Sequence, residues 1–493
     1  MNVLKRLFVF LIFFVFSLVP SSFTQTSLGS STSASLKVIA QEEPSAKVKS
    51  LLLVNAWLID GTGAPALEDA WVHIQGGRIV AVGKGTPVSV PGAQRIDLKG
   101  KTVIPGLSDM HAHLGTSDRA RWILKTLLAY GITTVRDTGN EIGHIAAIRR
   151  ELAGKEDVPA VYFGGPMMNG SFAERRFLKE GKALQMQLEE LTAFGLNFLK
   201  HHHWVTTTAV DQIVRHAEQH GLYVVGHVPM TMTSVAAIDH GVRVIEHIRM
   251  LPSEVLDDPE VIARYPIDIP FMRRKHYWAH FDPNGRAVKR TLDAWEKRKH
   301  KFFIDPTLVL EEVTGARYHP DHPEDPNLSL LSPGTRKRWK NTPSTKWGVL
   351  SKQEIAETQS VVDGMKIFMG MAYARGVRIL TGSDVLMSGV VPGPSLHREL
   401  ELLVEGGLSP VAVIHCSTGL AAESLRVTDR GLIKAGQIAD LVIVNGDLAR
   451  DITLLDQIEQ IMLSGRLYQP DQFLAEANRL AAMQTEPNLF HPF

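Results

Sequence analysis

The sequence predicts an α/β fold in which a (β/α)8 TIM barrel is flanked by a small β domain built from both ends of the chain. Short apolar segments alternate with amphipathic segments through the middle of the chain, which is typical of repeated strand–helix units. Strands and tight turns dominate the regions on either side of that repeat. The length of 493 residues also exceeds the usual size of one domain, so a second, smaller domain is expected.

The first β-rich region covers residues 50–103. Residues 50–60 are apolar and end at a Gly-Thr-Gly turn. Residues 70–83 predict a hairpin with Gly76 and Gly77 as its two-residue loop, and a further strand pair follows. This region therefore supplies the N-terminal part of the β domain.

The predicted barrel covers residues 104–430, and eight apolar segments supply its strands. Each segment has polar or reactive residues at its C-terminal end, where the chemistry of such barrels takes place. The stretches between most of them are amphipathic, and residues 208–221 place apolar residues three and four apart, as in a helix. The eight segments are residues 103–113, 131–137, 160–165, 196–203, 222–228, 242–248, 301–307 and 377–384.

Two stretches exceed what a minimal barrel needs, residues 251–300 and residues 311–350. Insertions after barrel strands lie over the active-site mouth, so they form either a lid or substrate wall, or a plain surface elaboration. The β pattern returns at residues 431–470, which supply the C-terminal part of the β domain. The tail, residues 471–493, begins as an amphipathic helix and ends irregularly.

The N-terminus has the pattern of a secretory signal peptide. Lys5 and Arg6 precede an apolar run at residues 7–19 that is short for a membrane span, and small and polar residues follow. Residues 1–40 are therefore interpreted as a signal peptide and flexible leader, with an uncleaved membrane anchor as the alternative. Cleavage predicts a secreted or periplasmic protein without a membrane partner.

Composition argues against other classes of protein. Lys and Arg total 53 and Asp and Glu total 52, so the basic excess of a nucleic-acid-binding protein is missing. Cys416 is the single cysteine, which excludes an intramolecular disulfide, and we interpret it as a buried apolar residue. The 20 histidines are more informative, because several fall at strand ends.

His111 and His113 are one residue apart at the end of an apolar strand. Side chains two positions apart on a strand share a face, so the two imidazoles point the same way and can bind one divalent cation. Four more strand-end residues converge on the same mouth: Lys200, His227, His247 and Asp384. Zinc accepts imidazole nitrogen and carboxylate oxygen, so the set predicts a zinc centre.

These motifs resemble those of the amidohydrolase superfamily, in particular its imidazolonepropionase-like and prolidase-like branch. The resemblance covers roughly residues 50–470 and implies that the β domain is a composite β-sandwich. The motifs are PGLSDMHAHL at residues 105–114, GITTVRDTG at residues 131–139, a strand-end lysine, histidines ending two successive strands, TGSD at residues 381–384 and GQIADLVIVNGD at residues 436–447.

The resemblance implies a centre of two zinc ions. Lys200 matches the position that family members carboxylate with CO2, and the resulting carbamate would bridge both ions. If Lys200 is not carboxylated, the site holds one ion. A metal-activated hydroxide would attack a carbonyl, with Asp384 as general acid and base. The implied ligands are His111, His113 and Asp384 for the first ion, and His227 and His247 for the second.

The resemblance thus implies a metal-dependent hydrolase of amide or peptide bonds, a dipeptidase of the Xaa-Pro type or a related one. Its substrates would be small molecules or short peptides. The alternatives are a hydrolase of cyclic amides, lactones or esters, and a non-catalytic metal-binding relative. The oligomeric state, including a homo-oligomer, is left open.

Arg136 and Asp137 end the second predicted strand. Arg136 either binds a substrate carboxylate with Asp137 behind it, or forms a structural ion pair with it. Arg273 and Arg274, in the first insertion, are further candidates to bind a substrate carboxylate.

Three histidines, His201 to His203, follow Lys200 directly. His203 is our candidate substrate contact, and the alternatives for the run are a metal ligand, a proton shuttle or no direct role. His397 and Glu399 follow the last predicted barrel strand and are interpreted as groups that orient Asp384. The alternative for this pair is a polar cluster at a helix N-terminus.

Overall fold

The computed structural model describes residues 50–87, 89–171, 176–265, 271–316, 325–341 and 351–484. The predicted signal peptide and leader lie outside these residues, as do parts of both insertions and of the tail. Within the described ranges, no helix combines the length and the apolar character that a membrane span requires.

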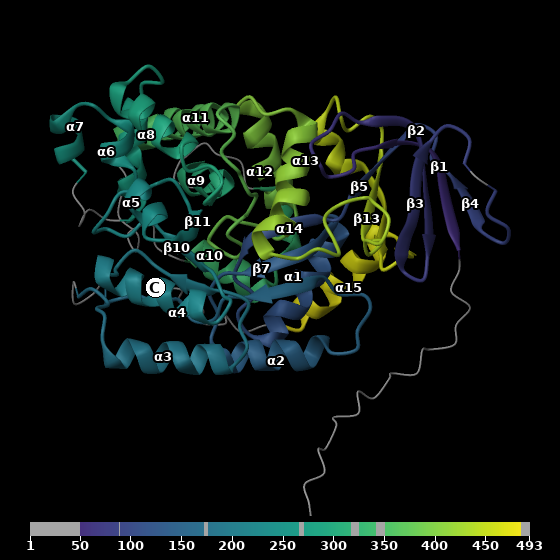
Figure 1. The fold of residues 1–493 in the computed structure, drawn as a ribbon, viewed down its shortest axis with the longest axis horizontal. Coiled ribbons are helices and arrows are strands. Elements are labelled where there is room, and N and C mark those ends of the chain that lie inside the picture. Colours follow the sequence, from purple (N-terminus) through teal and green to yellow (C-terminus); the bar gives the residue numbers. More distant parts are fainter. Residues whose placement is uncertain are drawn as a thin grey trace, which may run out of the picture. The chain divides into compact units, whose positions relative to one another are not determined.

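Strands from both ends of the chain pair in one eight-stranded sheet (Figure 1). Its strands are β1 (Leu51–Leu58), β2 (Leu67–Gln75), β3 (Arg78–Lys84), β4 (Gln94–Asp97), β5 (Lys101–Pro105), β13 (Leu441–Asn445), β14 (Ile458–Leu463) and β15 (Arg466–Tyr468). The order is β15-β14-β13-β5-β1-β2-β3, with β4 paired to β1. β5 joins the two halves, because it runs parallel to β1 and antiparallel to β13. The sandwich arrangement stays a prediction.

The predicted hairpin is confirmed. β2 and β3 pair antiparallel, and Gly76 and Gly77 connect them with φ values of +64° and +74°. Both values fall in the left-handed region that glycine enters without a steric penalty. Alternate residues of the sheet, among them Val72, Ile74 and Ile443, bury their side chains in one apolar cluster.

Seven of the eight predicted barrel segments contain strands, which form two parallel sheets. The first sheet orders β6 (Leu107–Ala112), β7 (Ile132–Asp137) and β8 (Ala160–Phe163). The second orders β9 (Leu199–His201), β10 (Val224–His227), β11 (Val242–Glu246) and β12 (Phe303–Asp305). The two sheets approach each other where Met168 forms a parallel bridge with His201.

The eighth predicted segment, residues 377–384, is not a continuous strand. It makes single contacts instead: Ile379 bridges Ile304 of β12, and the N–H of Met110 in β6 donates to the Thr381 carbonyl at 2.9 Å. The segment therefore lies between β12 and β6. Asp384 has a φ of +64°, which bends the backbone out of the extended conformation, and a single bridge between Val385 and Ala112 follows it.

Helices follow the parallel strands along the chain, as the periodicity predicts (Figure 1). The helix predicted at residues 208–221 is α4; Thr206 caps it by accepting the N–H of Ala209, and one side, including Ile213, is buried. The described helices outside the insertions that are treated next are α1 (Ser117–Ala129), α2 (Ile142–Leu152), α3 (Lys182–Ala193), α4 (Thr207–Gln219), α5 (Ser234–Asp239), α9 (Leu308–Ala316), α11 (Lys352–Ala374), α12 (Pro394–Glu405), α13 (Pro410–Ser417), α14 (Gly419–Leu425), η4 (Ile452–Gln457) and α15 (Pro470–Ala482).

The insertions are mostly helical where they are described. They contain α6 (Pro252–Val255), α7 (Pro259–Ala263), η1 (Phe271–His280), α8 (Arg286–Glu296), η2 (Pro326–Leu330) and α10 (Pro333–Asn341). Nζ of Lys275 in η1 lies 3.3 Å from Oε2 of Glu311 in α9. The other oxygen of Glu311, Oε1, lies 2.6 Å from Nη2 of Arg249, which is two residues beyond His247. The first insertion is thus tied to the end of β11. Its role as a lid stays a prediction, and the side chains of Arg273 and Arg274 lie outside the described ones.

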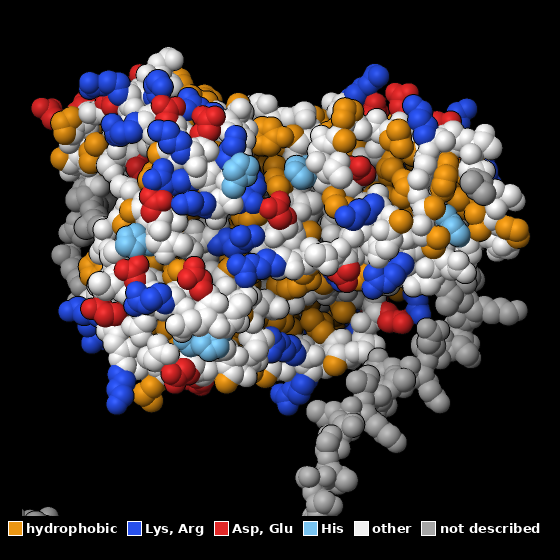
Figure 2. All heavy atoms as spheres, viewed as in Figure 1, with side chains coloured by type: hydrophobic (Ala, Val, Ile, Leu, Met, Phe, Trp, Pro, Cys, Tyr) orange, Lys and Arg blue, Asp and Glu red, His pale blue; other side chains and the backbone are white. Residues whose placement is uncertain are grey.

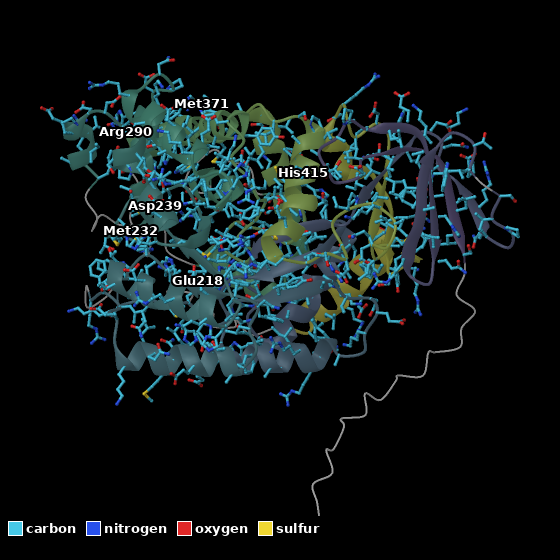
Figure 3. All side chains as sticks on the ribbon, viewed as in Figure 1. Glu218, Met232, Asp239, Arg290, Met371 and His415 are labelled. Atoms are coloured by element: carbon cyan, nitrogen blue, oxygen red, sulfur yellow. The ribbon has the colours of Figure 1, made fainter. Side chains whose placement is uncertain are left out.

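Other features of the molecule agree with the sequence. The predicted tail helix is α15, and Cys416 is buried and free. His415 of α13, labelled in Figure 3, lies 2.7 Å from the Gly61 carbonyl in the Gly-Thr-Gly turn. The face in Figure 2 intersperses Lys and Arg side chains with Asp and Glu, in keeping with the balanced composition.

Candidate metal centre

The paired histidines lie at the C-terminal end of β6, as predicted. His111 is inside the strand and His113 follows its last residue, and both side chains are buried. Their ring centroids are 5.3 Å apart. The N–H of Asp384 donates to the His111 carbonyl at 2.8 Å, and the N–H of His113 donates to the Val385 carbonyl at 2.5 Å. Backbone bonds therefore hold this strand end beside Asp384.

Asp384 brings three imidazoles together around one carboxylate. Its Oδ1 lies 3.2 Å from Nε2 of His113 and 3.7 Å from Nε2 of His111, while Oδ2 lies 3.8 Å from Nε2 of His247. Burial raises the pKa of Asp384, but His111 and His113 outweigh burial and hold the pKa well below its usual range. Asp384 and His247 both have left-handed φ values, +64° and +61°, a strain that clusters at functional sites.

His247 and His227 extend this group. The His247 ring centroid is 4.7 Å from that of His111 and 4.6 Å from that of His227. The ligand atoms of His111, His247 and Asp384 all lie within 4.8 Å of one another. Nδ1 of His247 lies 2.5 Å from Oγ1 of Thr307, which leaves Nε2 on the side of Asp384. The structure thus gathers the four histidines predicted at three strand ends.

Lys200 lies in β9 and is fully buried. Its Nζ has no hydrogen-bond partner among the described residues. Burial lowers the pKa of Lys200 to about 8. The neutral amine is the form that reacts with CO2, so an amine without a partner and with a lowered pKa suits a carbamate. The carbamate itself stays a prediction.

The donor set fits a transition metal ion. Imidazole nitrogen and carboxylate oxygen are ligands that zinc prefers, and both are present in a buried place. Burial lowers the pKa of His227 and of His247 well below the ordinary value, which keeps these rings neutral. A neutral ring has the lone pair that a metal needs.

A buried charge network behind the histidines was not predicted. Nη2 of Arg136 donates to Oε1 of Glu246 at 2.6 Å and to Oδ2 of Asp305 at 3.1 Å. The other oxygen of Glu246, Oε2, lies 2.5 Å from Nδ1 of His111. All four side chains are buried. His111 is therefore held at Nδ1 by a carboxylate, which directs its Nε2 toward the site.

The two carboxyl groups of this network differ in charge. Burial raises the pKa of Glu246, but Arg136 and Lys200 outweigh burial and bring the pKa below its ordinary value. Burial and the charge of Glu246 raise the pKa of Asp305 well above its ordinary value. Glu246 is thus the carboxyl group whose ionised form Arg136 favours, whereas burial beside Glu246 favours the neutral form of Asp305. Both residues lie near the C-terminal ends of predicted segments and are the last residues of β11 and β12, a position that sequence reasoning could have used as a signal.

Arg136 is not placed to bind a substrate carboxylate. Its side chain is fully buried, and its Nη2 is paired with Glu246 and Asp305, while Nη1 has no hydrogen-bond partner among the described residues. The alternative interpretation, a structural ion pair, matches these contacts, although the partner is Glu246 rather than Asp137. Asp137 instead accepts a hydrogen bond from Nδ2 of Asn140 at 2.9 Å.

Among the described residues, no hydrogen bond or ion pair joins His397 or Glu399 to Asp384. Nε2 of His397 lies 3.0 Å from the Tyr130 carbonyl, so this ring joins α12 to the end of α1. Glu399 accepts the N–H of Val309 at 2.7 Å and caps the start of α9. The interpretation as groups that orient Asp384 is corrected accordingly: both residues fasten α12 to its neighbours.

The three successive histidines separate into two environments. His201 packs against Gly226, where an added Cβ atom would lie 2.2 Å from Nε2 of the ring. His202 and His203 lie beside His227, with ring centroids 4.0 Å and 5.8 Å from it. His203 therefore borders the candidate metal centre, and its contact with substrate stays a prediction.

Known proteins share this fold. A Xaa-Pro dipeptidase structure with bound methionine is 21% identical, covers 85% of this chain and 100% of that chain, and has a TM-score of 0.62. The bottromycin amidohydrolase structure is 22% identical over 90% of this chain and 92% of that chain, with a TM-score of 0.66. At this identity the likeness shows the fold.

Curated relatives match over short segments. Imidazolonepropionase from Thermoanaerobacter pseudethanolicus is 44% identical over 48 residues, which is 10% of this chain and 11% of that protein. The matched segments span less than a fifth of the length of each of the three curated relatives. The family assignment has a broader basis, because the match to the amidohydrolase family extends over residues 102–468. The chain therefore belongs to the amidohydrolase family, whose members are metal-dependent hydrolases of C–N bonds.

Proposed function

We propose that the protein hydrolyses amide or peptide bonds in small substrates, as a dipeptidase of the Xaa-Pro type or a related one. The observation that carries this proposal is the position of Asp384, with its carboxylate oxygens 3.2 to 3.8 Å from the imidazoles of His113, His111 and His247. A carboxylate surrounded by metal-ligating side chains is placed both to bind a cation and to move a proton. The likeness to a Xaa-Pro dipeptidase structure supports the substrate class.

Zinc is the proposed metal, held by His111, His113 and Asp384 at the first position. His227, His247 and a carbamate on Lys200 are the proposed ligands of a second ion. When bound, the metal supplies a water of lowered pKa and polarises the substrate carbonyl.

The protein's own residues position and move the proton. Glu246 fixes the ring of His111 through Nδ1, and Thr307 contacts His247 in the same way. The ionised Asp384 accepts a proton from the attacking water and delivers it to the leaving amine. The buried walls of the site exclude bulk water from these groups.

Three further proposals concern the whole chain. The two parallel sheets and the segment at residues 377–384 form a closed (β/α)8 barrel, supported by the contacts of that segment with β12 and β6. The eight-stranded sheet folds into the composite β-sandwich that the family resemblance implies. The N-terminal pattern supports export, so the mature protein is secreted or periplasmic.

Metal content and turnover test the function together. We would measure zinc per chain and hydrolysis of a dipeptide panel, including Xaa-Pro dipeptides, on protein lacking residues 1–40. Asp384→Asn should fold like the wild type but lower kcat by about 10²–10⁴-fold. Turnover of cyclic amides without dipeptide hydrolysis would favour the second candidate, which the segment shared with imidazolonepropionase supports. A metal-loaded protein with no turnover of either class would contradict the proposal.

A further inference from the structure

A row of imidazoles continues beyond the residues that the resemblance assigns to the metal centre. From His247 the row passes to His227, at 4.6 Å between ring centroids, and from His227 to His202, at 4.0 Å. His203 follows, 4.0 Å from His202. The proposed function uses His227 and His247 but gives no role to His202 and His203.

Local structure brings the rings of His202, His203 and His227 together. β9 ends at His201, so His202 and His203 leave the regular alternation of the strand and both lie beside His227. The N–H of His202 donates to the Met168 carbonyl at 2.9 Å, and the His203 carbonyl accepts the N–H of Met230 at 3.0 Å. Backbone hydrogen bonds therefore fix the turn that presents the pair.

The group has the chemistry of a metal site. One nitrogen from each of His202, His203 and His227 lies within 4.8 Å of the other two, and all three side chains are buried. Three buried imidazoles cannot all be cationic, so neutral rings with lone pairs are available. Ligands of one zinc ion are about 3.3 Å apart at a bond length of about 2.1 Å, so binding has to draw the rings slightly inward.

We propose that His202, His203 and His227 form an all-imidazole site for a transition metal ion, distinct from the carbamate-dependent set. His227 then belongs to two overlapping ligand sets. One set needs carboxylated Lys200, and the other needs only histidines. Zn²⁺, Co²⁺ and Ni²⁺ suit three imidazoles, whereas Mg²⁺ and Ca²⁺ require oxygen ligands, which this set does not provide. The inference concerns the second metal ion of the proposed function. It is tested by metal binding, so it does not depend on hydrolytic activity.

The first experiment locates the metal in the wild-type protein. Crystals are grown in Zn²⁺ without bicarbonate, and anomalous scattering is measured at the zinc edge. A peak between His202, His203 and His227 supports the proposal. Zinc confined to the histidines around Asp384, or placed between Lys200 and His247, overturns it.

The second experiment uses variants and reads metal content, not turnover. In bicarbonate-free buffer, Lys200→Met should retain the second zinc ion, and the double variant His202→Gln/His203→Gln should lose it. His216→Gln/His220→Gln is the matched control, because these stacked rings, 4.2 Å apart, lie on α4 and at its end, where His216 contacts Thr192 of α3. Circular dichroism checks that each variant is folded.

The outcomes separate the two claims. Loss of the second ion in Lys200→Met, with full content in His202→Gln/His203→Gln, overturns the all-imidazole site and leaves the proposed hydrolase intact. Two ions in wild type and one in the His202/His203 variant, without turnover of any amide, would support the site while contradicting the function. Mg²⁺ that displaces the second zinc ion would also overturn the proposal.

Discussion

Nδ1 of His111 and Oε2 of Glu246 lie 2.5 Å apart, and both side chains are buried. The contact joins β6 to β11 beneath the metal centre. Glu246 also pairs with Arg136, so one carboxylate connects a candidate metal ligand to the ion network of the protein interior. The orientation of His111 and the charge balance of the core are therefore set by the same side chain.

The first prediction concerns Glu246→Gln. The amide keeps the shape of the side chain but removes the charge that holds His111, so zinc affinity should fall by about 10–100-fold. A competition titration with a chromophoric chelator measures it. Glu254→Gln is the control, because Glu254 is a buried carboxylate that bonds Ser234 rather than a site histidine. Equal affinities in both variants would show that Glu246 does not support the metal.

Arg136→Met tests the structural interpretation of Arg136. The change leaves the charge of Glu246 buried without its cation, so the free energy of unfolding should fall by about 3–5 kcal/mol. Denaturant unfolding followed by fluorescence measures it. Arg298→Met should cost less than about 1 kcal/mol, because its ion pair with Asp239, at 2.7 Å, is partly exposed to solvent. Of this pair, Figure 3 labels Asp239. A normal stability for Arg136→Met with a raised KM would restore the substrate-binding role.

Stability should depend on pH through Glu399. Burial raises the pKa of Glu399 from an ordinary value of 4.5 to about 8 in the folded protein. Between these values only the folded state holds the proton, so the free energy of unfolding falls as pH rises toward 8 and the stabilisation is fully present below about 4.5. Glu399→Gln removes this dependence and should gain about 1–3 kcal/mol over wild type at pH 9.

The pH profile of unfolding is the measurement for Glu399. Glu401→Gln, on the same helix but half-buried and paired with Arg398 at 2.8 Å, should keep the wild-type profile. If the free energy of unfolding changed with pH equally in wild type and in Glu399→Gln between pH 5 and 8, the pH dependence would belong to other groups.

Gly226→Ala tests the packing beside the metal centre. A Cβ atom there would lie 2.2 Å from Nε2 of His201, so the ring has to move and stability should fall by about 1–3 kcal/mol. Gly143→Ala in α2 is the control, because no atom lies within 4 Å of the added carbon and a helix favours alanine. Differential scanning calorimetry should show a lower Tm only for Gly226→Ala, and an unchanged Tm there would mean that the ring relaxes freely.

The sequence predicts that the candidate histidine ligands of the metal lie at strand ends, and the structure places them there, because strand periodicity is local. His111 and His113 share a face through alternation alone, and His227 and His247 are recognised as the ends of apolar segments. The strand positions for these residues follow from the same pattern. The prediction of Asp384 depends on the TGSD motif and not on a strand, because residues 377–384 form only an isolated bridge in the structure.

The buried network could not be derived in the same way. Glu246 and Arg136 are 110 residues apart in the sequence. Strand periodicity does not reveal which side chains of two distant strands contact each other. The contacts of His397 and Glu399 were mispredicted for a related reason. Proximity to Asp384 in the sequence suggested contact, whereas α12 turns these side chains toward Tyr130 and Val309.

The pairing of β5 with β13 has a consequence for how the chain is made. Val103 pairs with Ile443, so one edge of β5 has no partner until the chain has been translated as far as β13. An open strand edge is a template for pairing with other chains, and long-range pairing forms slowly. A nascent chain of this protein therefore carries an exposed strand edge until β13 has been synthesised, and β13 then covers that edge.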